Sequence, residues 1–203
     1  MIRYRMEVAT KRRRLSREDW VIAATAALGA GGLAAVAVEP LAAGLGATKG
    51  SFYAHFAHRA ELVAAVLDRW EEQATEARLA ALDALPDPRE RLRTLLVRAV
   101  MDAGKDPVEI SLWAAADNPL VTPVLRRVMS RRIGYLAGLF GALGFGRAEA
   151  RQRATLGYTA YLGHCQFAAR LPGTLPVRGD TDGYVELVLD LLVAPRRVAD
   201  ERP

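Results

Sequence analysis

The chain has 203 residues, of which 51% are hydrophobic and 25% are charged, a balance that excludes a disordered chain and fits an ordinary globular protein. This length suffices for one large domain or two small ones. The single cysteine, Cys165, excludes an internal disulfide framework and a thiolate metal cage within one chain. A lone cysteine fits a reducing compartment, so we expect a cytoplasmic location.

The excess positive charge is confined to the N-terminal third. Residues 1–60 hold nine lysines and arginines against four acidic residues, a net charge of +5 that equals the net charge of the whole chain. The remaining residues are therefore neutral in sum. This distribution indicates a polyanionic partner for the N-terminal third alone, although charge by itself is also compatible with a basic tail on a neutral protein.

The predicted elements begin at Ser16, an N-cap residue with Asp19 three positions later, which is a variant of the capping box. The first helix is expected to end at the glycines of residues 29–32. The apolar run 21–38 has the length of a signal peptide or a short membrane span. Because acidic residues interrupt its basic flank, glycines break it and alanine dominates it, we interpret it as two packed helices, with no targeting segment and no membrane partner.

Residues 41–56 form the most informative segment. A short helix over 38–44 is followed by a turn at Gly46, and Thr48 caps a third helix that reaches about residue 56. Leu41, Leu45, Phe52 and Phe56 are spaced to meet between the two helices, and the glycine turn sets their crossing.

The polar residues of this segment are left on or beside the outward face of the third helix. Their hydroxyl, ammonium and imidazole groups suit phosphate oxygens and base edges, and Gly50 lets the helix N-terminus approach a duplex closely. Taken singly, each residue also has a plain structural interpretation. In this order and within the basic third of the chain, they indicate DNA binding. The outward residues are Thr48, Lys49, Ser51, Tyr53 and His55.

A long helix is expected to begin at Arg59 and to reach about residue 85, and it is the only predicted element that joins the basic third to the rest. The remaining helices are expected over residues 89–103, 108–116, 118–145, 147–169 and 184–193. No alternating strand pattern and no sequence repeat occurs. The predicted fold class is therefore all-α, with about nine helices.

The segment of residues 41–56, with the positions that flank it, resembles the N-terminal signature of the TetR (tetracycline repressor) family. A small apolar helix and a glycine turn precede the run Thr48-Lys49-Gly50-Ser51-Phe52-Tyr53, and Arg59 and Glu61-Leu62 follow it. About residues 15–66 carry the resemblance, whereas the C-terminal two-thirds resembles the family only in helix number and length. The resemblance implies a ligand-responsive transcriptional regulator, a repressor by family default, without enzymatic activity, cofactor or metal.

The resemblance also implies an organisation and a set of DNA contacts. Residues 1–14 are then a basic arm outside the folded part, 15–58 the helix-turn-helix domain, and 59–203 the connecting helix with the effector-binding and dimerisation domain. Lys49, Ser51 and Tyr53 are expected to face the major groove of double-stranded DNA. The phosphate contacts implied by the family are Thr48, Tyr53, His55 and Arg59.

Two positions depart from the family pattern. Ala37 stands where many members place a threonine or serine that caps the second helix, and Glu39 stands where some members carry a base-reading arginine. Glu39 is suited to accept a hydrogen bond from cytosine N4, or to repel phosphate and lower non-specific affinity. Both interpretations stay open.

For the C-terminal part, the resemblance implies a ligand cavity and a homodimer interface made by the last two helices. Trp113, Asn118 and His164 are the residues expected to bind an effector. They come from a larger set of aromatic and polar groups on predicted buried faces, most of which are ordinary core: Met101, Asp117, Tyr135, Phe140, Tyr158, Tyr161, Gln166 and Phe167.

The last two helices carry more apolar residues than one face requires, in Ala154, Leu156, Ala160, Tyr161 and Ala168 and in Val185, Leu187, Val188, Leu191 and Leu192. This excess predicts a two-fold homodimer whose reading helices lie about 34–36 Å apart, to match a palindromic site.

Two other classes of protein, an enzyme and a helical scaffold, are alternatives to a DNA-binding regulator. An enzyme would use His164 and Cys165, but neighbouring residues on a helix point about 100° apart, which is poor geometry for a shared reaction or metal. No glycine-rich phosphate loop and no HExxH motif occurs. A helical scaffold would use the basic third for a protein or membrane partner, and its binding would resist salt, whereas DNA binding weakens steeply with salt.

Overall fold

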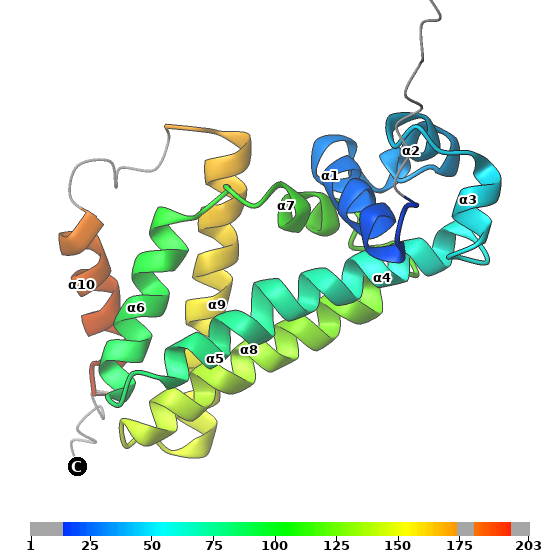
Figure 1. Cartoon of the computed structure of the whole chain (residues 1–203). Coiled ribbons are helices and arrows are strands. Elements are labelled where there is room, and N and C mark those ends of the chain that lie inside the picture. Colours follow the sequence, from blue (N-terminus) through cyan, green and yellow to red (C-terminus); the bar gives the residue numbers. More distant parts are fainter. Residues whose placement is uncertain (1–13, 174–180, 196–203) are drawn as a thin grey trace, which may run out of the picture.

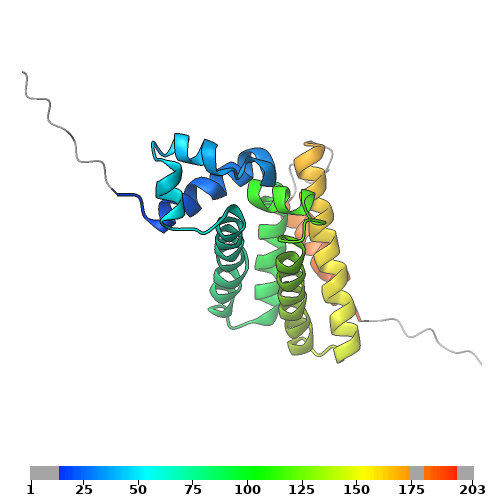
Figure 2. The same cartoon turned by 90° about the vertical axis from the view of Figure 1, so that its right-hand side faces the viewer.

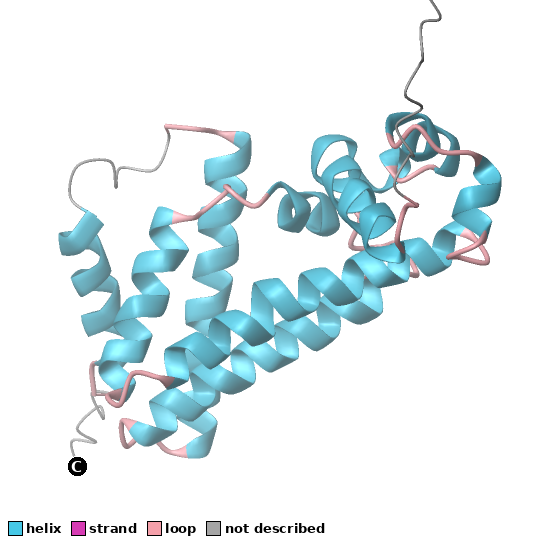
Figure 3. Ribbon diagram, in the orientation of Figure 1, coloured by secondary structure: helices cyan, strands magenta, loops and turns pink. Residues whose placement is uncertain are grey.

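The computed structural model describes residues 14–173 and 181–195, so nearly all of the predicted basic arm lies outside the described residues. Within these ranges the regular structure is helical throughout (Figure 3). The elements are α1 (Arg17–Ala35), α2 (Val38–Gly44), α3 (Lys49–Tyr53), α4 (Arg59–Glu71), the π-helical segment η1 (Glu72–Glu76), α5 (Ala77–Asp83), α6 (Pro88–Met101), α7 (Pro107–Ala114), α8 (Thr122–Ala142), α9 (Arg147–Arg170) and α10 (Thr181–Val193).

Because α4, η1 and α5 follow one another without a break, the described ranges contain nine separate helices, which confirms the all-α prediction. None of the helices described is both long and apolar enough to cross a membrane.

Several helices begin where side chains satisfy the free backbone N–H groups of the first turn. Ser16 and Asp19 form the predicted capping box of α1. The carboxylates of Asp87 and Asp106 accept hydrogen bonds from the first backbone N–H groups of α6 and α7, and each is followed by a proline whose missing N–H costs nothing there.

The first helix breaks within the predicted range of residues 29–32, and a short helical continuation reaches Ala35. Gly29 remains helical, and the break falls at Gly31 and at Gly32, where φ is +69°. A Cβ on Gly29 would lie 3.2 Å from Cγ of Pro107, so this glycine permits the close approach of α7 rather than ending the helix. The prediction that α8 begins at residue 118 was wrong, because the Asn118 side chain accepts from the Leu120 backbone and holds a turn before α8.

The helices are arranged around one long pair (Figures 1 and 2). The continuous helix α4–η1–α5 and α8 run beside each other, α1, α2 and α3 surround the N-terminal end of α4, and α6, α9 and α10 stand near the opposite end. We call α1–α3 the helix-turn-helix unit and α5–α10 the C-terminal bundle.

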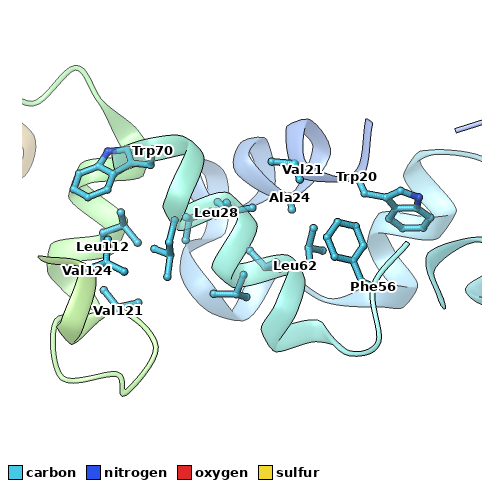
Figure 4. Close-up of a cluster of buried hydrophobic side chains, with 14 of the residues drawn as sticks. Trp20, Val21, Ala24, Leu28, Phe56, Leu62, Trp70, Leu112, Val121 and Val124 are labelled. Carbon is cyan, nitrogen blue, oxygen red and sulfur yellow. The ribbon is translucent and has the colours of Figure 1, made fainter. Parts of the chain in front are cut away.

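One hydrophobic core extends from the helix-turn-helix unit into the C-terminal bundle. It begins at Trp20 and Phe56, follows α4 through Leu62 to Trp70, and ends at Leu112 of α7 and the start of α8 (Figure 4). Helix α7 packs directly against α1. The prediction that the long helix is the only connection was therefore wrong, since α7 gives the bundle a second contact with the unit.

Candidate functional site

The helix-turn-helix unit is held by an aromatic core. Phe52 of α3 is fully buried, with its ring 5.4 Å from Trp20 of α1 and 5.5 Å from Phe56. Leu41 is buried and Leu45 packs against the same cluster. The predicted meeting of α2 and α3 side chains is confirmed, and it fixes which face of α3 points outward.

The turn between α2 and α3 has the expected backbone. Gly46 has φ of +61°, a conformation that favours glycine. The Thr48 hydroxyl accepts a hydrogen bond from the Ser51 backbone at 3.2 Å and so caps α3. A Cβ on Gly50 would meet only Thr48 Oγ1, at 3.6 Å, so nothing within this chain requires a glycine there.

The outward surface of α3 carries Tyr53, whose side chain is 59% exposed, and Lys49. Lys49 forms an ion pair with Glu39 of α2, and both side chains are exposed. The hydrogen bond and the positive charge of Lys49 lower the pKa of the Glu39 carboxyl, and the same contacts raise the pKa of Lys49. Both groups are therefore charged at neutral pH.

Two residues expected to touch phosphate have partners within the chain. His55 Nε2 lies 3.0 Å from the Leu15 carbonyl oxygen. The Arg59 guanidinium donates to the carbonyl oxygens of Leu33 and Val36, and so satisfies the C-terminal end of α1. Both contacts stabilise the helix-turn-helix unit, and the phosphate roles of these residues stay predictions.

The cap of α4 was missed by sequence reasoning. The His58 Nδ1 atom accepts from the Glu61 backbone N–H at 3.2 Å, and the Glu61 carboxylate accepts from the Ala57 backbone N–H at 2.7 Å. This reciprocal pair resembles a capping box, with a histidine in place of serine or threonine.

The C-terminal bundle encloses a cavity of about 590 Å³, in the range of small-molecule pockets. Most of its wall is aliphatic and aromatic and comes from α5, α6, α8 and α9, while α7 contributes Glu109, Ile110 and Trp113. Leu79, Leu92, Leu136 and Phe140 are representative of the apolar wall.

One side of the cavity is a buried polar cluster centred on Arg132 of α8. Its Nη1 donates to Glu109 Oε1 at 2.8 Å, its Nε donates to Thr75 Oγ1 at 3.0 Å, and its Nη2 donates to the Ala74 carbonyl at 3.1 Å. This carbonyl lies within the π-helical segment η1, where the α-helical i→i+4 bonding pattern is interrupted. Tyr161 completes the cluster by donating to Glu109 Oε2 at 3.3 Å.

Burial controls the protonation of the cluster. Desolvation raises the pKa of the Tyr161 and Tyr158 hydroxyls and of the Cys165 thiol, so these groups are neutral at pH 7. Burial also works against the charged Arg132, but the Glu109 carboxylate outweighs this cost and keeps the pKa of the guanidinium above its usual value. The cluster therefore contains one cation, one anion and several neutral groups.

The structure places only one of the three expected effector residues at the cavity. Trp113 lines it, whereas Asn118 holds the turn before α8, and His164 lies beside Tyr184 of α10 with 5.4 Å between ring centroids. Met101 and Phe167, expected on buried faces, are about half exposed. Neither Asn118 nor His164 is among the residues that line the cavity, and their binding roles stay predictions.

Sequence reasoning missed the charged pair Glu109 and Arg132. Glu109 is the one ionisable residue in an otherwise apolar helix, Pro107–Ala114, and this was the signal that it points inward. Arg132 follows Arg131, and nothing in the sequence distinguishes the buried arginine from its exposed neighbour.

The last two helices present an apolar surface to solvent. Leu156 of α9 is 62% exposed, and Leu187 and Leu191 of α10 are 57% and 67% exposed. Helix α10 packs mainly on α6 and touches α9 at two places, where Gly157 lies beside Leu192 and where the His164 ring lies 5.4 Å from the Tyr184 ring. We call these three leucines the α9–α10 surface. Other apolar residues of the same helices, among them Leu192, are buried within the chain.

These features define a helix-turn-helix DNA-binding unit: a buried aromatic core, a glycine turn, and a short, capped α3 with an exposed polar face. Residues 21–66 match the sequence model of bacterial regulatory proteins of the tetR family. This segment is therefore a DNA-binding domain of the tetR type. No curated protein sequence matches the chain.

The whole chain has the fold of solved regulators. A transcriptional regulator from Rhodococcus sp. Rha1 is 22% identical, with a TM-score of 0.69, and the match covers 88% of this chain and 94% of that one. A TetR-family regulator from Agrobacterium tumefaciens is 19% identical, with a TM-score of 0.66 and coverage of 87% and 95%. AibR in complex with isovaleryl coenzyme A and operator DNA is 16% identical, with a TM-score of 0.62 and coverage of 89% and 99%. At these identities the likeness shows the fold.

Proposed function

We propose that the protein is a ligand-responsive transcriptional repressor that binds a palindromic operator as a homodimer. The observation that carries the proposal is the tetR-family helix-turn-helix unit joined by one continuous core to a bundle with a ligand-sized cavity. The structure of AibR with an acyl-coenzyme A and operator DNA supports the pairing of these two functions on this fold. A protein with this function works in the cytoplasm, where the chromosome is.

The α9–α10 surface supports the homodimer. Exposed leucines concentrated on two adjacent helices are typical of an interface with a second copy, because a monomer rarely leaves a contiguous apolar patch in water. Two copies joined there would present two α3 helices to successive turns of the major groove, about 34 Å apart.

The contact between α1 and α7 supports a route for induction. Glu109 and Trp113 of α7 line the cavity, while Pro107 at the start of the same helix packs on Gly29 of α1. A ligand that shifts α7 would therefore displace α1, and with it the α3 of each subunit. Its effect is limited to its differential affinity for the two arrangements, typically about 1–3 kcal/mol.

The chemistry of His164 and Cys165, the pair that an enzyme would use, fits binding rather than catalysis. Cys165 lines the cavity, where burial raises the pKa of its thiol and disfavours the nucleophilic thiolate. His164 Nδ1 lies 3.1 Å from the Ala160 carbonyl oxygen, and its ring packs on Tyr184. Within the described residues no group of three potential ligands is placed to hold a metal ion.

The proposed contacts of α3 are tested by Lys49→Ala and Tyr53→Phe. Each is expected to weaken binding to an operator selected from a random DNA pool by about 1–3 kcal/mol, because each removes a polar contact to the duplex and no buried group. Gel-shift titration measures the loss, and circular dichroism checks the fold. Ser111→Ala, far from α3, serves as a control that leaves affinity unchanged. Wild-type affinity in both α3 variants would contradict the assignment.

The ion pair between Glu39 and Lys49 provides a separate prediction. Glu39→Gln removes one negative charge from the DNA-facing surface and frees Lys49, so binding to random-sequence DNA is expected to strengthen by about threefold to tenfold. The measurement is fluorescence anisotropy with operator and random duplexes at two salt concentrations. If Glu39 reads cytosine, operator binding will weaken while random binding strengthens. An unchanged affinity for both duplexes would show that Glu39 does not face DNA.

A further inference from the structure

The inner side of the cavity combines a wide apolar wall with a single buried ion pair. The side chain of Glu109 is 6% exposed and that of Arg132 is 11% exposed, and 2.8 Å separate Arg132 Nη1 from Glu109 Oε1. The other side chains of the cluster are neutral: Thr75, Tyr158 and Tyr161 carry hydroxyls, and Cys165 carries a thiol. The other charged residues of the lining are exposed (Arg78, Arg98, Asp102 and Lys105) or half-buried (Asp106). At its buried end, a molecule in the cavity therefore meets an apolar surface and a polar cluster whose charges cancel.

This arrangement is unfavourable for a buried ion. A carboxylate brought to the polar end would need a free cation, but Arg132 is already neutralised by Glu109, and the incoming charge would also meet the Glu109 carboxylate. A cation would meet Arg132 in the same way. Either ion loses its hydration at the buried end without gaining a partner of opposite charge there, and such a loss disfavours binding.

An uncharged polar group finds partners there. An arginine carries five N–H donors, and Arg132 directs three of them to Glu109, Thr75 and Ala74. The Glu109 carboxylate has four lone pairs and accepts from Arg132 and Tyr161. Both donor and acceptor capacity remain, and the Tyr158 hydroxyl is buried without a hydrogen-bond partner. A group that both donates and accepts matches this end.

We propose that the cavity selects uncharged, largely apolar molecules that carry one group able both to donate and to accept hydrogen bonds, such as a carboxamide, an alcohol or a phenol, and that it discriminates against carboxylates of the same shape. The proposal deepens the effector role and rests on it only for its biological meaning. The test measures ligand binding directly, so loss of DNA binding would overturn the repressor function without affecting this result.

The test compares biphenyl-4-carboxamide with biphenyl-4-carboxylate, two probes of nearly equal shape that differ in charge. Isothermal titration of the full chain at neutral pH is expected to show about tenfold or greater preference for the amide. Because Trp113 lines the cavity, both heat and tryptophan fluorescence should report binding, and Trp113→Phe should remove most of the fluorescence change.

Glu109→Gln shows which group controls the preference. It removes the negative charge but keeps an acceptor for Arg132, so the carboxylate should gain about tenfold or more and the preference should invert. Asp102→Asn is the matched control, because Asp102 also lines the cavity and loses the same charge but is exposed and paired with Lys105. It should change the ratio less than about twofold, since exposed charges are screened.

If Glu109→Gln fails to fold, the double variant Glu109→Gln/Arg132→Gln, neutral at this position, should still prefer the amide. Equal or tighter binding of the carboxylate to the wild-type chain would overturn the proposal. A preference that Glu109→Gln leaves unchanged would overturn it too, since the carboxylate would then lie away from Glu109, beside the exposed cations of the lining, Arg78, Arg98 and Lys105. The proposal would also be contradicted if neither probe bound and if dodecanol, an uncharged apolar alcohol, caused no change in Trp113 fluorescence.

Discussion

Leu191→Glu is expected to convert the dimer into a monomer and to weaken operator binding by about a hundredfold or more. Leu191 is 67% exposed, so the glutamate is well solvated in the monomer and the fold should be retained. In a dimer the glutamate would be buried against the same glutamate of the second copy or against apolar side chains, and burying such a charge costs several kcal/mol. A monomer then binds one operator half-site where the dimer binds two at once, so the affinity gained from linking the two DNA-binding units is lost.

Sedimentation equilibrium measures the mass, and gel-shift titration measures the affinity. Leu187→Glu on the same surface should behave like Leu191→Glu. Leu120→Glu is the matched control, because Leu120 is an exposed leucine that precedes α8 and lies off both helices. A Leu191→Glu protein that stays dimeric at micromolar concentration and binds operator normally would place the interface elsewhere.

The helix-turn-helix unit was predictable from the sequence because its determinants are local. The Ser16 cap, the Gly46 turn, the Thr48 cap and the spacing of Phe52 and Phe56 each act within a few residues, and the structure contains all of them. The bounds of α2 also agree with the prediction. Where such signals overlap, the local sequence determines both the fold and its outward face.

Predictions that depended on distant contacts were less successful. Residues 29–32 do break α1, at Gly31 and Gly32, but the sequence did not show that Gly29 admits Pro107, which lies far along the chain. The family motif also did not indicate the hydrogen bonds that His55 and Arg59 form back to Leu15 and to the end of α1, and the DNA roles of both residues stay predictions. A sequence pattern places a side chain on an element, but it does not identify a partner from another element.

The cavity shows the same limit. Trp113 was recognised because a large aromatic group on an apolar helix is a common ligand contact, whereas Asn118 and His164 were chosen for their polarity alone. The decisive residues, Glu109 and Arg132, are recognised only as a pair, because each is costly to bury without the other. That pairing joins positions on α7 and α8 that no local periodicity relates.

Arg132→Met is expected to destabilise the protein by about 3–5 kcal/mol, the cost of leaving a buried carboxylate without its cation. The guanidinium also holds the Ala74 carbonyl and the Thr75 hydroxyl of η1, and it lies 5.7 Å from the Trp70 ring, so three helices lose a shared contact. Such a loss is a large part of the net stability of a typical protein. Urea denaturation followed by circular dichroism measures the loss.

The control and the rescue separate charge pairing from simple loss of volume. Arg131→Met, one residue away, removes only a half-exposed pair with Glu76 and should cost less than about 1 kcal/mol. The double variant Glu109→Leu/Arg132→Met replaces the pair by apolar groups of similar size and should recover most of the lost stability, because no charge is left unpaired. If the double variant is as unstable as Arg132→Met, the cost arises from the hydrogen bonds to η1 rather than from the stranded carboxylate. If Arg132→Met unfolds at the same urea concentration as the wild type, Glu109 is not confined to a dry site, and the cavity is open to water at its polar end.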